Sequence, residues 1–576
     1  MSDPVPTRPT ICLSMIVRNE AGVVTRALSL VAPFIDSWVI VDTGSHDGTQ
    51  DVIRDHMAQL GVPGRLYERP WRNFGDNRTE ALALAQGRAD YIWVLDADDA
   101  VVGTPDLTGL HADVYEVRRK FESVVYWLPQ LFRDGLPVRY IGVTHEYTRW
   151  DSDQAAVHLE GPYHVEDLHV SARNQSGEKA ARDRDLLLAE VNRNPDDARS
   201  VFYLAQSYFD LGDYDQALTW YARRIELGGW DQEVYFAMFR TALAMRLAGA
   251  PWPQVQDAYL RAWEFRPARA EPLYNIAVAY RQDQRYEPAY LFARRAAEIC
   301  YPAEDTLFVS SDVYAWRAAD EQAVCASQLG RHGEAFAVCR QLLARADIPA
   351  GDRQRIAVNR DYSVPAMIAA ASSYPDGLVR DLGVGPRRGD VTVSAVAGPD
   401  RAVVEQTLNS FLRCCTDVQR VGRFLVVAAG LSDSDRVLLG QRYRFIELVD
   451  CSTDVAAIRD HIEGRRWLHL GQGWQFFAPE NLIARLTAVL DAEPQVVQVG
   501  VNVGDAAGLT GVCAAEEVVC RAPGAGGRYL RAEVVSSGPA MFETARLDRA
   551  GTQMSAATLD EVLCIPVQRS PLAPRD

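Results

Sequence analysis

A chain of 576 residues with a formal net charge of −17 is longer than one hydrophobic core usually fills, so we expect about three domains. The acidic balance excludes a general nucleic-acid binder, because such proteins gather Lys and Arg on one face to contact phosphates. The first nine residues are largely polar, and the apolar run at 11–17 is too short to span a bilayer. We therefore expect a cytoplasmic protein with no membrane span and no nucleic-acid partner.

Residues 11–95 alternate short apolar runs with segments of helical period. This pattern is typical of a mostly parallel sheet with helices on both faces. The predicted strands lie at 11–17, 38–41, 65–68 and 91–95. An open α/β sheet binds its ligands at the carboxyl ends of the strands, so the residues that follow each strand are the first place to look for a site.

The fourth predicted strand ends in Asp96-Ala97-Asp98-Asp99. Two carboxylates one residue apart at a strand end can converge on Mg²⁺ or Mn²⁺, which prefers oxygen ligands and completes its shell with diphosphate oxygens and water. Such a cation neutralises charge on a departing nucleoside diphosphate. An isolated D-x-D is more often a solvated acidic turn, so its interpretation depends on the neighbouring strand ends.

Polar motifs also follow the first two predicted strands. Arg18-Asn19-Glu20 follows the first, and Asp42-Thr43-Gly44-Ser45-His46-Asp47-Gly48-Thr49 follows the second. With the D-x-D, these motifs resemble the family 2 glycosyltransferases with the GT-A fold, whose strand ends carry N-E, D-x-G-S-x-D-x-T and D-x-D in that order. The resemblance implies a donor-binding set made of Arg18, Asn19, Glu20, Asp42, Gly44, Arg78 and Asp96. It also implies that Asp96 and Asp98 hold the metal.

Physical chemistry supports several of these implied roles. The carboxylate of Asp42 can accept a hydrogen bond from the ring N–H of a base such as uracil, and Gly44 allows the backbone to turn tightly beneath it. Arg78 stands where the related family places an arginine near the donor phosphates; the alternative is a solvated arginine at a helix start. The resemblance further suggests a histidine ligand to the metal, for which His169 is our prediction.

A second stretch, Gly142-Val143-Thr144-His145-Glu146, resembles the G-x-x-H-E sequence of a subgroup that includes lipopolysaccharide-core transferases. An inverting transfer needs a general base to take the proton of the acceptor. We predict Glu146 in that catalytic role, with Asp99 as its rival beside the metal site. The alternative is that His145 and Glu146 only order a loop.

From 178 to 346 the pattern changes to continuous helices with small residues recurring twelve positions apart. These pairs are Ala205 and Ala217, Ala277 and Ala289, and Ala323 and Ala335. The segment resembles degenerate tetratricopeptide (TPR) repeats, with generic antiparallel helices as the alternative. Such an array offers a groove for an extended peptide or a partner protein.

The rest of the chain is predicted as a linker followed by a copy of the first domain. Residues around 374–390 are rich in Gly, Pro and Arg, which favours a linker. In the copy, Gly430 aligns with Gly44 while Ala428 stands in place of Asp42. Both D-x-D carboxylates are replaced, because Gly471-Gln472-Gly473 lies over Asp96-Ala97-Asp98. We expect a degenerate GT-A-like domain with a structural or acceptor-recognition role.

These observations predict an α/β plus all-α protein. Its expected parts are a GT-A domain at 1–175, TPR-like repeats at 176–350, a linker at 351–390 and the degenerate domain at 391–576. The predicted activity is metal-dependent, inverting transfer of a sugar from a nucleoside-diphosphate sugar, a UDP-sugar by preference, to a saccharide or to a peptide or protein. The alternative is a non-catalytic TPR scaffold with transferase-like domains. Nucleotidyl transfer would need a basic, glycine-rich first loop, which residues 18–22 do not supply.

Overall fold

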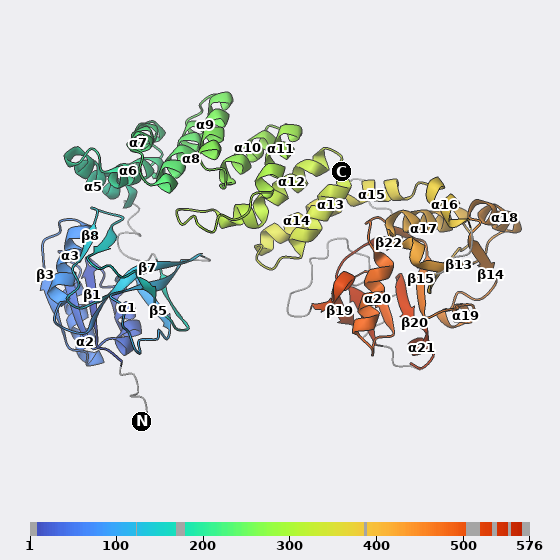
Figure 1. Cartoon of the computed structure of the whole chain (residues 1–576), viewed down its shortest axis with the longest axis horizontal. Helices are drawn as coiled ribbons and strands as arrows, with labels where there is room; N and C mark the ends of the chain where they lie inside the picture. The colour runs from blue at the N-terminus through green and yellow to red at the C-terminus, as the bar shows by residue number, and fades with distance from the viewer. Residues whose placement is uncertain are drawn as a thin grey trace. The chain divides into compact units, whose positions relative to one another are not determined.

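The computed structural model describes residues 8–121, 124–168, 179–384, 389–502, 519–532, 538–550 and 555–566. The chain forms two compact units (Figure 1). The first comprises 1–266 with 305–308, and the second comprises 267–304 with 309–576. Each unit combines a sheet with part of the helical segment, so the units divide within the helices rather than at the predicted boundaries of 175 and 390. The predicted α/β plus all-α class is confirmed.

The sheet of the first unit has nine described strands in the order β3-β2-β1-β4-β7-β6-β11-β5, with β10 paired to β6. The four predicted strands all form, and they run parallel to one another. The strands are β1 (Ile11–Val17), β2 (Ser37–Asp42), β3 (Gly64–Glu68), β4 (Tyr91–Val94), β5 (Asp99–Gly103), β6 (Val114–Phe121), β7 (Val124–Arg133), β10 (Val157–His158) and β11 (Tyr163–Asp167). Strand β7 is antiparallel to β4 and begins the mixed half of the sheet.

Helices cover both faces of this sheet, as the sequence pattern predicts. The alternating side chains Leu13 and Met15 pack with α1 (Val24–Val31) and α2 (Thr49–Leu60) on one face. Cys12 and Ile92 point to the other face and pack with α3 (Phe74–Ala85). Since parallel strands buried on both faces are almost wholly apolar, the polar residues are displaced to the strand ends.

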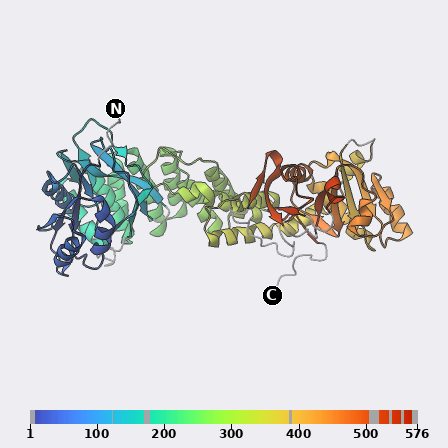
Figure 2. The same cartoon turned by 90° about the horizontal axis from the view of Figure 1, so that it is seen from below.

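Five described helices of the first unit follow the sheet in the chain, and each packs against the next. They belong to the green part of the chain in Figure 2. They are α5 (Lys179–Arg193), α6 (Ala198–Asp210), α7 (Tyr214–Leu227), α8 (Asp231–Leu247) and α9 (Trp252–Phe265). Ala205 and Ala217 are fully buried where α6 and α7 cross, against Tyr221 and Ala237. Small residues at these crossings let the helices approach closely, which is the packing expected of TPR-like hairpins.

The second unit contains further helices, and three of them lie where the sequence predicts a linker. Its helices are α10 (Glu271–Gln282), α11 (Tyr286–Ala297), α12 (Ala318–Gln328), α13 (His332–Leu343), α14 (Ala350–Tyr362), α15 (Val364–Ala371) and α16 (Asp376–Leu382). The last three occupy most of 351–390. Val364 and Val379 are buried in the same core as the C-terminal sheet. The Gly, Pro and Arg residues around 374–390 misled the prediction, because Pro375 stands at the start of α16, where proline is tolerated.

The first four positions of the C-terminal sheet repeat the strand order of the first sheet, whereas the chain order of the remaining strands differs. The order of the C-terminal sheet is β14-β13-β12-β15-β20-β17-β21-β19-β18. The strands are β12 (Val391–Val396), β13 (Val421–Val427), β14 (Ile446–Val449), β15 (Arg466–Gln472), β17 (Gln498–Gly500), β18 (Cys520–Ala522), β19 (Gly527–Ala532), β20 (Ala540–Glu543) and β21 (Ala556–Leu559). From β14 to β19, each neighbouring pair has the same parallel or antiparallel sense as its counterpart from β3 to β5.

The strand register agrees with the predicted internal alignment. Ser14 pairs with Val94 in the first sheet, and Ser394 pairs with His469 in the second. A bulge then follows on β15, and Gly471-Gln472-Gly473 occupies the strand end where Asp96-Ala97-Asp98 stands in the first sheet. A side chain at Gly471 would lie 3.4 Å from the indole of Trp474. The second strand end therefore lacks the two carboxylates of the first.

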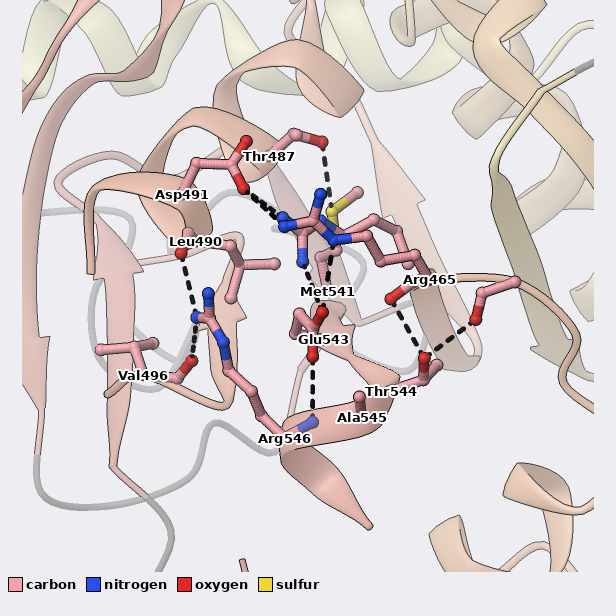
Figure 3. A network of polar contacts seen from close by, with 12 residues as sticks. Arg465, Thr487, Leu490, Asp491, Val496, Met541, Glu543, Thr544, Ala545 and Arg546 are labelled. Atoms are coloured by element: carbon pink, nitrogen blue, oxygen red, sulfur yellow. Dashed lines mark hydrogen bonds and ion pairs between the residues drawn. The ribbon is translucent and has the colours of Figure 1, made fainter. Parts of the chain in front are cut away.

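Ion pairs brace the edge of this second domain (Figure 3). The side chain of Arg466 is 1% exposed and pairs with Asp491 of α20 (Leu482–Ala492). Arg546 donates to the backbone carbonyls of Leu490, Glu493 and Val496 at 2.8–2.9 Å. Glu543 forms an ion pair with Arg465 at 3.3 Å and accepts a hydrogen bond from the backbone N–H of Arg546 at 2.9 Å. Because buried charges are costly unless paired, this set fixes α20 against the sheet.

Within the described parts of the chain, no helix combines the length and apolar composition that crossing a bilayer requires.

His469 on β15 gives the C-terminal domain a pH-dependent stability. Its Nδ1 lies 2.9 Å from Ser394 Oγ, and burial lowers the pKa of the ring to about 4. Since the unfolded ring titrates near 6.5, stability is full above that pH and is lost as the pH falls toward 4. We expect the wild type to lose about 2 kcal/mol relative to His469→Val between pH 7 and pH 5. Denaturation of both proteins at the two pH values measures this; equal losses would contradict it.

Candidate functional site

The carboxyl ends of β1, β2 and β4 meet at one edge of the first sheet and open on a cavity of about 850 Å³. Because neighbouring parallel strands end together, the three motifs that are far apart in sequence come together here. The cavity is lined by Arg18, Asn19, Glu20, Thr43, Asp96 and Asp98 from the strand ends and by Arg78 from α3. The structure thus brings most of the predicted donor and metal residues around one space.

The loops after β1 and β2 are joined by side chains of the second motif. The backbone N–H of Asn19 donates to Ser45 Oγ at 2.8 Å, and that of Glu20 donates to Thr49 Oγ1 at 2.9 Å. Asn19 in turn adopts a left-handed backbone conformation with φ of 58°. Sequence reasoning did not assign these roles to Ser45 and Thr49, because a polar turn residue that binds a ligand and one that binds a neighbouring loop look alike in sequence.

Asp47 belongs to the same junction. Its carboxylate accepts from the backbone N–H of Ala21 at 3.1 Å and from that of Thr49 at 3.1 Å. Although burial acts in the opposite direction, these hydrogen bonds hold the pKa of Asp47 below its ordinary value. The negative charge is therefore retained, and Asp47 links the two loops by hydrogen bonds.

Asp42 lies at the end of β2 with a side chain that is almost completely buried. Its Oδ1 accepts from the N–H of Gly44 at 2.9 Å, of Ser45 at 3.0 Å and of Gln50 Nε2 at 3.1 Å. Its Oδ2 is buried and accepts no hydrogen bond from the described residues. An unmet buried acceptor costs about 1–3 kcal/mol, so this oxygen favours a ligand that donates a hydrogen bond. Gly44, with φ of 105°, provides the turn.

Arg78 connects two acidic motifs at the cavity. From α3, its Nη2 lies 2.5 Å from Asp96 Oδ1 and its Nε lies 2.6 Å from Glu146 Oε1. Burial lowers the pKa of the guanidinium, but the two carboxylates raise it well above its ordinary value. The arginine therefore stays charged, and it sets the position of the first D-x-D carboxylate and of the predicted base.

Asp99 lies beneath the D-x-D turn rather than beside the cavity. Its carboxylate forms a two-pronged pair with Arg119 of β6, at 2.7 and 2.8 Å, and its Oδ2 also accepts from the backbone N–H of Asp96 at 2.9 Å. The Asp99 side chain is 1% exposed. Burial raises the pKa of Asp99 to about 6, and the charge of Arg119 opposes this rise. These contacts suit a residue that shapes the turn more than one that meets an acceptor.

Glu146 lies in the loop between β8 (Val138–Ile141) and β9 (Tyr147–Trp150), which docks on the start of α3. The N–H of Phe74 donates to the carbonyl of Val143 at 3.1 Å, and that of Gly75 to Gly142 at 3.2 Å. A Cβ on Gly75 would lie 2.4 Å from the Gly142 carbonyl oxygen, so this approach requires glycine. The loop is therefore held against the helix that carries Arg78.

The first helices of the array hold the same loop from the other side. The ring of His145 stacks on Tyr203 of α6 at 4.2 Å, and its carbonyl accepts from Arg199 Nη2 at 3.0 Å. Asp183 of α5 accepts from Thr144 Oγ1 at 3.2 Å. His145 has φ of 51°, a strained value for a residue other than glycine, and these contacts keep it there. None of this could be read from sequence, since the partners lie about 40 to 60 residues away.

The helix α5 also lines the cavity, which sequence analysis did not predict. Its contribution is Lys179, Arg182, Asp183, Asp185, Leu186 and Ala189. The predicted metal ligand His169 lies outside the described residues. In the described parts, no three His, Cys, Asp or Glu side chains gather around one point, so a cation at this edge would take only part of its ligands from the protein.

An open α/β sheet binds its ligands at the carboxyl ends of its strands, and in this sheet acidic motifs stand at three adjacent strand ends. The model of glycosyl transferase family 2 matches residues 12–108, which hold all three motifs. This part of the chain is therefore a family 2 domain, as the motifs predict.

The helical part is TPR-like. A TPR repeat-containing protein of Synechococcus elongatus is 36% identical over 93 residues, which are 16% of this chain and 21% of that relative. The chain thus spans about a fifth of the length of this curated relative.

Solved structures that resemble parts of the chain include MamA from Desulfovibrio magneticus RS-1. The two sequences are 14% identical, the match covers 30% of this chain and 88% of that chain, and the TM-score is 0.24. Another is the mannosyltransferase PcManGT from Pyrobaculum calidifontis, solved with GDP-Man and Mn²⁺. It has 22% identity, covers 17% of this chain and 32% of its own, and has a TM-score of 0.15.

The Arg119–Asp99 pair is expected to be essential for the stability of the turn. Arg119→Ala would leave the buried Asp99 carboxylate without its counter-charge, which costs about 3–5 kcal/mol. Urea unfolding at pH 7 measures the loss. Arg54→Ala is the matched control, because Arg54 forms exposed pairs with Asp51 and Glu68 that are worth less than about 1 kcal/mol. Similar losses in both variants would show that the buried pair has no special role.

Proposed function

We propose that the chain is a metal-dependent, inverting glycosyltransferase that takes a sugar from a nucleoside diphosphate, by preference UDP, and passes it to a saccharide, peptide or protein acceptor. The observation that carries the proposal is that Glu20 and the Asp96-Ala97-Asp98 turn line one cavity at one edge of a family 2 domain, and that Thr43, which follows Asp42 at the end of β2, lines the same cavity. Each motif alone has an ordinary structural explanation, whereas their convergence on a space of this size favours a shared ligand.

The donor nucleoside is proposed to lie at the ends of β1 and β2. The unmet Oδ2 of Asp42 would accept the ring N–H of uracil, in keeping with its burial and its fixed neighbour Gly44. Glu20, only 8% exposed and held by Thr49, lines the same cavity. These contacts favour a base that carries a donor N–H, which UDP provides.

The residues at the end of β4 fit a divalent cation. Asp96 and Asp98 both line the cavity, and Mg²⁺ or Mn²⁺ is typically held by one or two carboxylates together with substrate phosphates and water. When bound, such a cation stabilises charge that develops on the departing diphosphate. Arg78 orients Asp96 through a fixed ion pair, so the chain itself prepares this ligand.

Glu146 is the base that we propose for the acceptor. The loop that carries it is fixed by α3, by Asp183 and by Tyr203, so its carboxylate is held in place before the acceptor arrives. Its rival Asp99 has both oxygens bonded to Arg119. A general base must reach the acceptor proton, and this requirement favours Glu146, whose side chain is 12% exposed, over Asp99, whose side chain is 1% exposed.

Asp98→Asn tests the metal role. Because the amide is a weaker cation ligand, we expect kcat/KM for sugar-nucleotide turnover with Mn²⁺ to fall by roughly 100-fold or more. Released nucleotide, detected by mass spectrometry over UDP-, GDP- and dTDP-sugars, is the measurement. Asp153→Asn, an exposed carboxylate in a loop outside the cavity, controls for the change of charge. Full activity of Asp98→Asn would remove Asp98 from the metal site.

Glu146→Gln tests the base. The amide keeps the shape of the side chain but cannot take a proton, so kcat for transfer should fall by about 10²–10⁴-fold while the donor KM changes little. The transfer rate with acceptor present is compared with nucleotide binding in the same variant. A variant that kept its kcat, with donor binding intact, would point to another base.

A further inference from the structure

The first helix of the array has two functional faces. Four of the six α5 positions that line the cavity, 179, 182, 186 and 189, recur at three or four residues and so share one side of the helix. A second side carries Leu187 and Val191, which are buried against Val143 and the first residues of α6. The helix therefore packs as the first member of the array and at the same time forms a wall of the cavity.

The cavity-lining end of α5 brings basic side chains to the space in front of the D-x-D. Lys179 and Arg182 line the cavity together with Asp96 and Asp98. The two acids of this helix that also line it are engaged by the protein: Asp183 accepts from Thr144 Oγ1, and Asp185 pairs with Arg184 at 2.7 Å. Asp210, which feels the charge of Lys179, is bonded to Arg240.

Outside α5, the bases that line the cavity are Arg18 and Arg78, and Arg78 is committed to carboxylates of the protein. Arg78 is bonded to Asp96 and Glu146, so its charge is shared between two carboxylates of the protein. A departing nucleoside diphosphate gains negative charge on its phosphate oxygens, and fixed cations aimed at those oxygens stabilise it most in a partly enclosed site. Lys and Arg are the side chains that proteins use to bind phosphate oxygens.

We propose that Lys179 and Arg182 bind the phosphates of the donor diphosphate, so that the first helix of the array is part of the donor site. This inference rests on the proposed function, because it needs a nucleoside diphosphate in the cavity. It adds that the family 2 domain is incomplete without α5. The strand-end motifs would recognise the nucleoside, and α5 would recognise the phosphates.

The experiment separates phosphate contacts from nucleoside contacts in the full-length chain. Binding of UDP with Mn²⁺ and binding of uridine are measured by calorimetry for wild type, Lys179→Ala and Arg182→Ala. We expect each variant to bind UDP at least ten-fold more weakly than wild type and to bind uridine as wild type does. The charge-conserving changes Lys179→Arg and Arg182→Lys should recover part of the UDP affinity.

The matched control lies on the same helix. Arg193→Ala removes an exposed cation that pairs with Glu190 at 2.9 Å, and neither of these two residues lines the cavity. It should leave both affinities unchanged. Unchanged UDP affinity in Lys179→Ala and Arg182→Ala would overturn the inference, and so would an equal loss of uridine affinity. A wild type that binds neither UDP nor uridine would overturn the proposed function as well, whereas the first two outcomes leave it standing.

Discussion

The guanidinium of Arg78 joins the two carboxylates on which the site depends, Asp96 at the end of β4 and Glu146 in the β8–β9 loop. Its side chain is 12% exposed, so these ion pairs form where water screens them little. Without the shared cation, two acids at one edge of the cavity would repel each other and the turn would lose its orientation. Helix α3 therefore connects the D-x-D strand end to the loop of the proposed base.

The rest of the site is supported by contacts between the loops that carry its residues and the neighbouring strands and helices. Asp47 and Thr49 fasten the loop after β1 to the loop after β2, and Arg119 supports the D-x-D turn from below through Asp99. The helices α5 and α6 hold the loop of Glu146 through Asp183, Arg199 and Tyr203. A site held in this way depends on the helical array for its geometry, which gives a physical reason for the fusion of a family 2 domain to TPR-like helices.

Much of the architecture could be predicted from the sequence, because it depends on local pattern. The four parallel strands follow from apolar runs, and the strand-end motifs follow from the rule that parallel strands end together. Even the second sheet could be aligned with the first, down to Gly471 and Gly473 in place of the D-x-D. The helices α14 to α16 were missed, because the Gly, Pro and Arg residues around 374–390 look like loop signals until the core that buries Val364 is known.

The parts of the site that could not be predicted are those made by distant partners. The burial of Asp99 depends on Arg119, and the strained backbone of His145 depends on helices that follow it in the chain. The cavity face of α5 depends on where the first repeat docks. Sequence spacing does not report these distances, so the carboxylate roles could be ranked only after the structure was known.

The central claim is that Asp96 and Asp98 share one divalent cation with the donor diphosphate. Anomalous diffraction from crystals of the full-length protein soaked with Mn²⁺ and UDP tests it most directly. We expect one manganese peak within bonding distance of Asp98 and of the UDP phosphates, with the uracil against Asp42. Bound UDP with no manganese at this edge, or manganese at a place remote from both aspartates, would contradict it.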